Sequence, residues 1–156
     1  MTTKVLFVCL GNICRSPTAE GVFRKLVADA GLSAQFEIDS AGTGSWHVGE
    51  APDKRAQQAC RAHGIDISKH RARRVRAADF ESFDLILACD EQNLRDLTDM
   101  KPQGATAEIR LLMPFAGNPA DRVVPDPYYG GPGDFENTVQ RACAACAGLL
   151  RQLSAK

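Results

Sequence analysis

The sequence predicts a doubly wound α/β fold, with one parallel sheet and helices on both of its faces. Four short runs of β-favouring apolar residues lie at positions 5–8, 36–39, 85–89 and 109–112, and a stretch with helical character follows each run. The 156 residues contain no internal repeat and no linker. We therefore expect a single domain spanning residues 1–156, whose right-handed crossovers place helices on both faces of the sheet.

The first half of the chain supplies two strands and two helices. After the strand at residues 5–8, the apolar positions 19, 22, 23, 26, 27 and 30 share one face of a helix that begins at Pro17 and ends at Gly31. Apolar and polar residues alternate in the second strand, residues 36–39. A loop of small residues follows at 40–46, and the second helix is expected between Pro52 and Gly64.

The second half supplies the remaining elements. Residues 85–89 are apolar on both faces, which is typical of a central strand in a parallel sheet. Asp90 is expected to cap a short helix over residues 93–97, and the fourth strand at 109–112 comes after a loop. A final helix covers residues 135–153. It is preceded by a long loop, residues 114–133, and long loops in compact domains are usually functional.

Composition excludes several functional classes. Nineteen basic residues balance nineteen acidic ones, so no overall field favours nucleic acid or a membrane surface. No apolar run is long enough to span a bilayer, and the N-terminus lacks the pattern of a signal peptide. The six cysteines are then expected to be free thiols in a reducing compartment, which predicts a cytoplasmic protein.

The strongest functional signal is the stretch from Cys9 to Pro17, Cys-Leu-Gly-Asn-Ile-Cys-Arg-Ser-Pro. It joins a strand to a helix, so backbone N–H groups and a helix N-terminus converge on one point and form an anion site. Gly11 and Asn12 tolerate the positive φ that such a tight loop needs. Arg15 can grip two phosphate oxygens, and Cys9 at the mouth of the site would act as a thiolate nucleophile.

A second cysteine and arginine share the spacing of Cys9 and Arg15 but not their context. Cys89 is followed by Arg95, yet the residues between them contain no glycine and carry two carboxylates that would repel a phosphate. The alternative for Cys9 is a buried core thiol, but the preceding strand and the glycine within its loop favour the reactive site.

Asp126 is the candidate acid. It lies between Pro125 and Pro127, which hold the backbone stiff, and Tyr128 and Tyr129 follow at once. A simple turn-forming role is the alternative for this aspartate.

Two other side chains have a structural and a functional interpretation. Trp46, the only tryptophan, is either a partly buried core ring or a wall beside the site at the carboxyl edge of the sheet. His63 falls on the inner face of the second expected helix, where we expect hydrogen-bonded support of the site rather than direct chemistry.

Two further patterns are expected to be structural. The basic run at residues 69–76 is interpreted as a solvated surface, with attraction of acidic phosphoprotein segments as the alternative. Cys143 and Cys146 have the spacing of a redox or metal pair, but on a helix among alanines they are expected to fill the core. No second pair completes a zinc site, so no metal is expected.

Taken together, these motifs resemble those of the low-molecular-weight protein tyrosine phosphatases. The stretch Val8–Pro17 with Ala19-Glu20 is similar to that family's phosphate loop, and Asp126-Pro127-Tyr128-Tyr129 is similar to its general-acid loop. Ser40-Ala41-Gly42-Thr43, His63-Gly64 and the segment 90–94 are also similar to family segments, so the resemblance covers nearly the whole chain. It implies a flavodoxin-like fold with a four-stranded sheet, and hydrolysis of phosphotyrosine in proteins without metal or cofactor.

The resemblance also implies roles for individual residues. Cys9 would form a phosphocysteine, Arg15 would hold the phosphate and Asp126 would protonate the leaving group. Ser16 would hydrogen-bond the Cys9 sulfur, and Asn12 would hold the loop, with His63 behind it. Cys14 would be the partner for a protective disulfide, while Trp46, Tyr128 and Tyr129 would clamp the substrate ring. The expected phosphate-binding residues are Leu10, Gly11, Asn12, Ile13, Cys14, Arg15 and Ser16.

Two alternatives stay open at this point. Thioredoxin-coupled arsenate reductases share the fold and the cysteine-arginine loop but need two further cysteines in a mobile segment, whereas Cys60 lies on an expected helix face and Cys89 ends a core strand. A module that binds phosphotyrosine without turnover is the other alternative, and the full set of nucleophile, arginine and acid argues against it. The expected partners are phosphotyrosine-containing proteins, and the chain is expected to be a monomer or a weak oligomer.

Overall fold

The computed structural model describes residues 2–155, so residues 1 and 156 of the expected domain lie outside the described range. Four parallel strands form one sheet in the order β2-β1-β3-β4: β1 is Thr3–Cys9, β2 Phe36–Gly42, β3 Leu85–Ala88 and β4 Glu108–Leu111. β1 and β3 are central and almost wholly buried, as their continuous apolar sequences require. The expected α/β fold with a four-stranded parallel sheet is confirmed.

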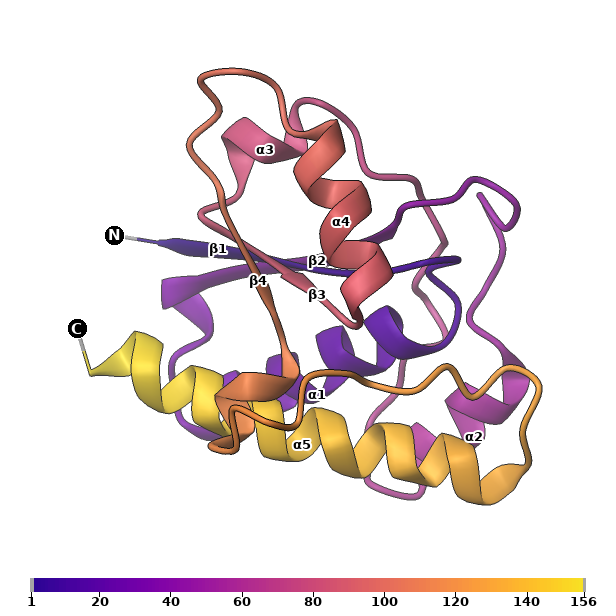
Figure 1. The fold of residues 1–156 in the computed structure, drawn as a ribbon. Helices are drawn as coiled ribbons and strands as arrows, with labels where there is room; N and C mark the ends of the chain where they lie inside the picture. Colours follow the sequence, from indigo (N-terminus) through magenta and orange to yellow (C-terminus); the bar gives the residue numbers. More distant parts are fainter. Residues whose placement is uncertain (1, 156) are drawn as a thin grey trace.

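Helices pack on both faces of the sheet (Figure 1). α1 (Arg15–Asp29), α2 (Lys54–Arg61) and α5 (Pro132–Ser154) lie on one side, where Phe7, Phe23 and Phe135 are among the largest buried side chains. α3 (Asp79–Ser82) and α4 (Glu91–Met100) lie on the other, over a smaller core that includes Phe80 and Ile86. Alternate residues of β1 face the two cores, so this strand holds both layers together.

Several element boundaries differ from the expected ones. β2 continues to Gly42 because residues 40–42 pair with the end of β1, so the loop begins later than expected. α2 ends at Arg61, α4 runs to Met100, and the four-residue helix α3 was not expected. Short 3-10 helices, η1 (Ser33–Gln35) and η2 (Met113–Ala116), were not expected either.

The strands run in the same direction, so their carboxyl ends meet at one edge of the sheet. β1 ends at Cys9 and β3 is followed by Cys89 and Asp90. Among the described residues, no helix is long and apolar enough to cross a membrane.

Candidate active site

The loop between β1 and α1 is held by Asn12, the one described non-glycine residue with a positive φ, at 59°. Its side chain is fully buried. Nδ2 donates to Ser16 Oγ at 2.8 Å and to Ser40 Oγ at 3.0 Å, while Oδ1 accepts from His70 Nε2 at 2.9 Å and from the Arg73 backbone N–H at 3.0 Å. A left-handed backbone conformation costs an L-residue energy, so these hydrogen bonds hold the loop in a shape it would otherwise leave.

Gly42 allows this loop to sit against the end of β2. A Cβ on Gly42 would lie 2.6 Å from the Leu10 carbonyl oxygen and 3.2 Å from the Asn12 nitrogen. These contacts are with backbone atoms, which cannot move aside, so the position requires glycine.

Cys9 lies at the centre of the loop and is only 3% exposed. The Asn12 backbone N–H donates to its Sγ at 3.3 Å, and Ser16 Oγ lies 3.0 Å from the same sulfur. α1 begins at Arg15, so its N-terminus adds favourable electrostatic potential for an anion. The environment therefore suits a thiolate.

Arg15 is also buried, and its orientation is set by neighbours from outside the loop. Nη1 donates to Asp90 Oδ2 at 2.7 Å and to the Val124 carbonyl at 3.0 Å. Burial opposes the charge of Arg15, but the negative charge that the Cys89 and Cys9 sulfurs and the Asp90 carboxylate carry when ionised outweighs this effect and raises the pKa of Arg15. Asp90 caps α4 as expected, through a hydrogen bond from the Asn93 N–H, but its contact with Arg15 was not foreseen.

Asp126 lies across the site from the loop. Its Oδ2 is 3.9 Å from Arg15 Nη2, and its Oδ1 accepts from the Tyr128 backbone N–H at 3.2 Å. The two tyrosine rings that follow pack edge to face, with centroids 5.0 Å apart. The Asp126 side chain therefore does stabilise a local turn, through its bond from the Tyr128 N–H, and its other carboxylate oxygen faces Arg15.

A pocket of about 370 Å³ joins these groups. Its lining contains the thiol of Cys9, the arginine and the aspartate, together with aromatic side chains. The lining residues are Cys9, Leu10, Gly11, Ile13, Cys14, Arg15, Trp46, His47, Asp126, Tyr128 and Tyr129. Asn12 and Ser16 are the two expected loop residues that do not line it, because they are buried behind the loop and hydrogen-bonded to each other.

Trp46 is a wall of this pocket and is 71% exposed, so the core-ring interpretation is wrong. Its ring lies against Gly44, where a Cβ would come within 1.8 Å of Cζ3. The next residue, His47, also lines the pocket and was not singled out from the sequence. It packs over Gly11 and its Nδ1 lies 3.2 Å from the Glu50 carboxylate.

Comparisons with known proteins agree with this geometry. A family model described as "Low molecular weight phosphotyrosine protein phosphatase" matches residues 4–156. The chain is 51% identical over 133 residues to a protein of that name from Schizosaccharomyces pombe, covering 85% of each chain, and 44% identical over 152 residues to one from Homo sapiens, covering 97% of this chain and 96% of the relative. The chain belongs to this family.

A solved protein tyrosine phosphatase has the same fold over nearly its whole length. The protein tyrosine phosphatase of Entamoeba histolytica, solved with Hepes in its active site, superposes with a TM-score of 0.94 at 37% identity, covering 99% of this chain and 98% of that one. The membership and the fold expected from the sequence motifs are therefore confirmed.

His63 does not support the phosphate loop of this phosphatase, and that prediction is wrong. α2 ends at Arg61, and the turn at Gly64 follows, so His63 leaves the inner face. It is exposed and its Nε2 pairs with the Glu136 carboxylate at 2.8 Å. The histidine behind the phosphatase loop is His70, which bonds Asn12.

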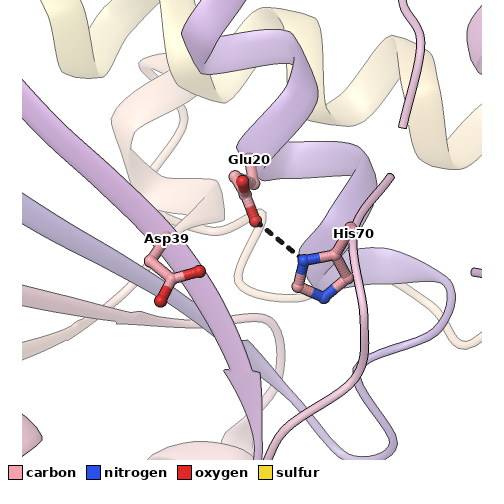
Figure 2. Close-up of side chains that lie close together, drawn as sticks. All are labelled: Glu20, Asp39 and His70. Atoms are coloured by element: carbon pink, nitrogen blue, oxygen red, sulfur yellow. Dashed lines mark ion pairs between the residues drawn. The ribbon is translucent and has the colours of Figure 1, made fainter. Parts of the chain in front are cut away.

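His70 belongs to a cluster with Glu20 and Asp39, from α1 and β2 (Figure 2). Its Nδ1 forms an ion pair with Glu20 Oε1 at 3.5 Å when the ring is protonated, and the same Glu20 oxygen accepts a hydrogen bond from Ser40 Oγ at 2.7 Å. The three side chains could approach one cation. Each carboxylate is already paired with an arginine, Glu20 with Arg24 and Asp39 with Arg73, so we interpret the cluster as support for the loop.

The basic run at residues 69–76 is only partly a solvated surface. Arg73 pairs with Asp39 at 3.1 Å and with Asp79 at 3.0 Å, and Arg74 donates to the Thr43 carbonyl. The segment also adds backbone hydrogen bonds beside the end of β2, from Gly42 to the Arg73 carbonyl and from Val75 to the Gly42 carbonyl. It therefore fixes the back of the phosphatase site.

The remaining thiols are held in their protonated form. Burial raises the pKa of Cys14 and of Cys89 well above the ordinary range, with Asp53 adding to the effect at Cys14, and burial raises the pKa of Cys60 to about 11. All cysteines are free. Cys146 is fully buried and Cys143 is half-buried against the core, as expected for residues that fill space.

Proposed function

We propose that this phosphatase hydrolyses phosphotyrosine in proteins through a phosphocysteine on Cys9. The observation that carries the proposal is that Cys9, Arg15 and Asp126 line one pocket, at the N-terminus of α1. A thiolate can attack phosphorus there, while the arginine and the loop N–H groups stabilise the negative charge of the phosphate oxygens.

In the first proposed step, the Cys9 sulfur forms a bond to phosphorus as the ester P–O bond breaks in line. Asp126 gives its proton to the leaving phenolate oxygen, so that tyrosine departs neutral. Arg15 holds the equatorial oxygens, and Asp90 and the Val124 carbonyl keep its guanidinium oriented.

In the second proposed step, water attacks the phosphocysteine. Asp126, now ionised, accepts a proton from the water, and Cys9 leaves as a thiolate with the electrons of the S–P bond. Ser16, whose Oγ lies 3.0 Å from the sulfur, donates a hydrogen bond to that thiolate and lowers the energy of its departure. Inorganic phosphate is released and the enzyme is restored. The steps use protein groups alone, so we propose no metal or cofactor.

The pocket walls support aryl phosphates as the substrate class. Trp46, Tyr128 and Tyr129 line the sides, while the reactive sulfur lies at the loop behind them. A phosphotyrosine ring can reach the loop between aromatic walls, whereas the short side chain of phosphoserine cannot. We propose phosphotyrosine-containing proteins as partners. The six free cysteines support a reducing, cytoplasmic location. We also propose that the chain acts as a monomer or weak oligomer.

The test compares Cys9→Ser and Asp126→Asn with wild type on aryl phosphates whose leaving groups span a range of pKa. Cys9→Ser should lose turnover but still bind inorganic phosphate, and Cys89→Ser should retain turnover. Asp126→Asn should slow tyrosine-like esters by about 10² to 10⁴ and nitrophenyl esters clearly less, because a good leaving group needs less protonation.

The matched control is Asp134→Asn, which removes a carboxylate that caps α5 through the Gly131 N–H. It should leave the leaving-group dependence unchanged. Parallel plots of log rate against leaving-group pKa for wild type and Asp126→Asn would remove Asp126 from the role of acid. Comparable efficiency on phosphoserine and phosphotyrosine peptides would contradict the substrate class, and phosphate binding without turnover in the wild type would favour a binding module.

A further inference from the structure

The segment that carries Asp126 has few hydrogen bonds to the rest of the protein, although Pro127 is buried and the Tyr128 ring packs against the core. Residues 117–131 contain no helix or strand, and α5 begins directly after them at Pro132. Up to Val124 the segment is anchored, since the Val124 N–H donates to the Cys89 carbonyl at 2.7 Å. In residues 125–130, the described hydrogen bonds of Asp126 and Gly130 stay within the segment.

The exception is a hydrogen bond from Arg55. Its Nη2 donates to the Tyr128 carbonyl at 3.0 Å. Among the described residues this is the one hydrogen bond that ties positions 125–130 to another part of the chain. The tie lies two residues from Asp126, and the guanidinium carbon also sits 5.5 Å from the centre of the Tyr128 ring.

Arg55 is itself firmly held. Its Nε and Nη2 donate to the two oxygens of Asp53 at 3.1 and 2.9 Å, which is the paired geometry that a planar guanidinium forms with a carboxylate. The guanidinium carbon also lies over the Phe135 ring, 4.6 Å from the centre of the ring. The hydrogen bonds from Arg55 lower the pKa of Asp53, so the Asp53–Arg55 pair is ionised at neutral pH.

Asp53 connects this arrangement to the phosphate loop. Its backbone N–H donates to the Ile13 carbonyl at 2.9 Å, and its side chain caps α2 by accepting from the Arg55 N–H at 2.8 Å. One continuous path therefore runs from Ile13 in the loop, through Asp53 and Arg55, to Tyr128 beside the acid.

We propose that Arg55 is a positioning residue of the phosphatase, which holds the segment with Asp126 and Tyr128 at a fixed place relative to the phosphate loop. The proposal rests on the proposed role of Asp126 as acid. Arg55 does not line the pocket, so it acts through the residues it holds. Proton transfer depends steeply on distance, and a misplacement of about 1 Å can cost up to about 10²-fold in rate.

Two substitutions separate the parts of this role. Arg55→Met keeps an unbranched apolar stem but loses every side-chain hydrogen bond, whereas Arg55→Lys keeps the charge but cannot donate to Asp53 and Tyr128 with a rigid fork. The control is Arg61→Met, at the other end of α2. Arg61 is exposed, and within the described part of the chain its side chain makes no hydrogen bond or ion pair, although its carbonyl accepts from the Gly64 N–H at 3.0 Å.

The experiment measures kcat/KM against leaving-group pKa, together with inhibition by inorganic phosphate. Arg55→Met should lower kcat/KM about 10-fold for tyrosine-like esters and less for nitrophenyl esters, because kcat/KM reports the formation of the phosphocysteine, the step in which Asp126 acts as the acid. Arg55→Lys should lie between it and wild type. The inhibition constant for phosphate should change less than about twofold, since Arg15 and the loop N–H groups are untouched. Arg61→Met should match wild type in each measurement.

A double-mutant comparison makes the test decisive. If Arg55 acts through Asp126, then Arg55→Met should have little further effect on kcat/KM in the Asp126→Asn background. An equal loss in both backgrounds, or an equal loss for all leaving groups, would overturn the positioning role while leaving the proposed function intact. If the slope of log rate against leaving-group pKa is the same in Asp126→Asn as in wild type, Asp126 is not the acid. The proposed role of Arg55 is then overturned with it.

Discussion

Replacing Asn12 by alanine should be among the most destabilising single changes in this protein. The substitution removes the four hydrogen bonds of the buried amide. Ser16 and Ser40 keep other partners, but the Arg73 backbone N–H loses its acceptor, which costs about 1 to 3 kcal/mol. Each of the other three bonds contributes about 1 kcal/mol, and the left-handed backbone adds about 1 kcal/mol for alanine. We expect a loss of about 5 kcal/mol or more, a large part of the stability of a domain this size.

The assay is urea unfolding followed by circular dichroism, with Asn12→Gly as a companion variant. Glycine loses the same hydrogen bonds but adopts a positive φ readily, so it should be more stable than alanine by about 1 kcal/mol. Asn137 is an exposed residue of α5, and Asn137→Ala is the control, with an expected change within about 0.5 kcal/mol. A loss below about 1.5 kcal/mol for Asn12→Ala would refute the argument that this amide holds the loop.

The remaining predictions concern oxidation, the two histidines and acid stability. Cys14→Ser should keep most of the turnover but make peroxide inactivation irreversible, because a neighbouring thiol traps a sulfenic acid as a disulfide; equal recovery of wild type and variant with a reductant would contradict this. His70→Ala should lower stability by about 1 to 2 kcal/mol and should also lower activity. His63→Ala should change stability by about 0.5 kcal/mol or less. Urea titrations and rate assays of both variants check these expectations. The pKa of Asp53 is below its ordinary value of 3.8 in the folded state, so its stabilising effect is present above that pH and is lost as pH falls below it. Asp53→Asn should therefore lose less stability than wild type between pH 5 and pH 3, and equal losses would remove this assignment.

The part of the site that the sequence predicted well is the part that is local in the chain. Cys9, Asn12, Arg15 and Ser16 come from one short loop, and its glycine, its arginine and the strand before it are enough to indicate an anion site. Asp126, which the structure places in the pocket, was singled out because two prolines and two tyrosines mark its segment. Such signals need no knowledge of which distant residues meet.

The residues that were missed reach the site from distant segments without regular structure. His70 lies on a stretch without helix or strand, where no periodicity indicates which way a side chain points. His63 was preferred because it continued the apolar face of a helix, but that helix ends two residues earlier. A few residues past the end of a helix, its periodicity no longer places a side chain on the inner face.

Arg73 and Asp90 show the same limit for charges. A run of basic residues and a helix-capping aspartate have ordinary surface interpretations, and the composition agrees with them. Their partners, Asp39 and Arg15, are separated from them by 34 and 75 positions in the sequence. Only the order of the strands in the sheet brings these pairs together.

The pocket has a floor and a rim of different chemical origin, and this has a consequence for inhibitor design. The floor is a loop whose shape is set by buried residues and whose anion-binding groups include backbone N–H groups, which side-chain substitution does not remove. The rim consists of side chains such as Trp46 and Tyr129, which are 71% and 95% exposed, so substitutions there should cost little stability. A compound that draws its affinity from a phosphate mimic on the floor should bind any relative that shares this loop. Selectivity for this enzyme has to come from groups placed against Trp46 and His47, and resistance mutations should appear there first.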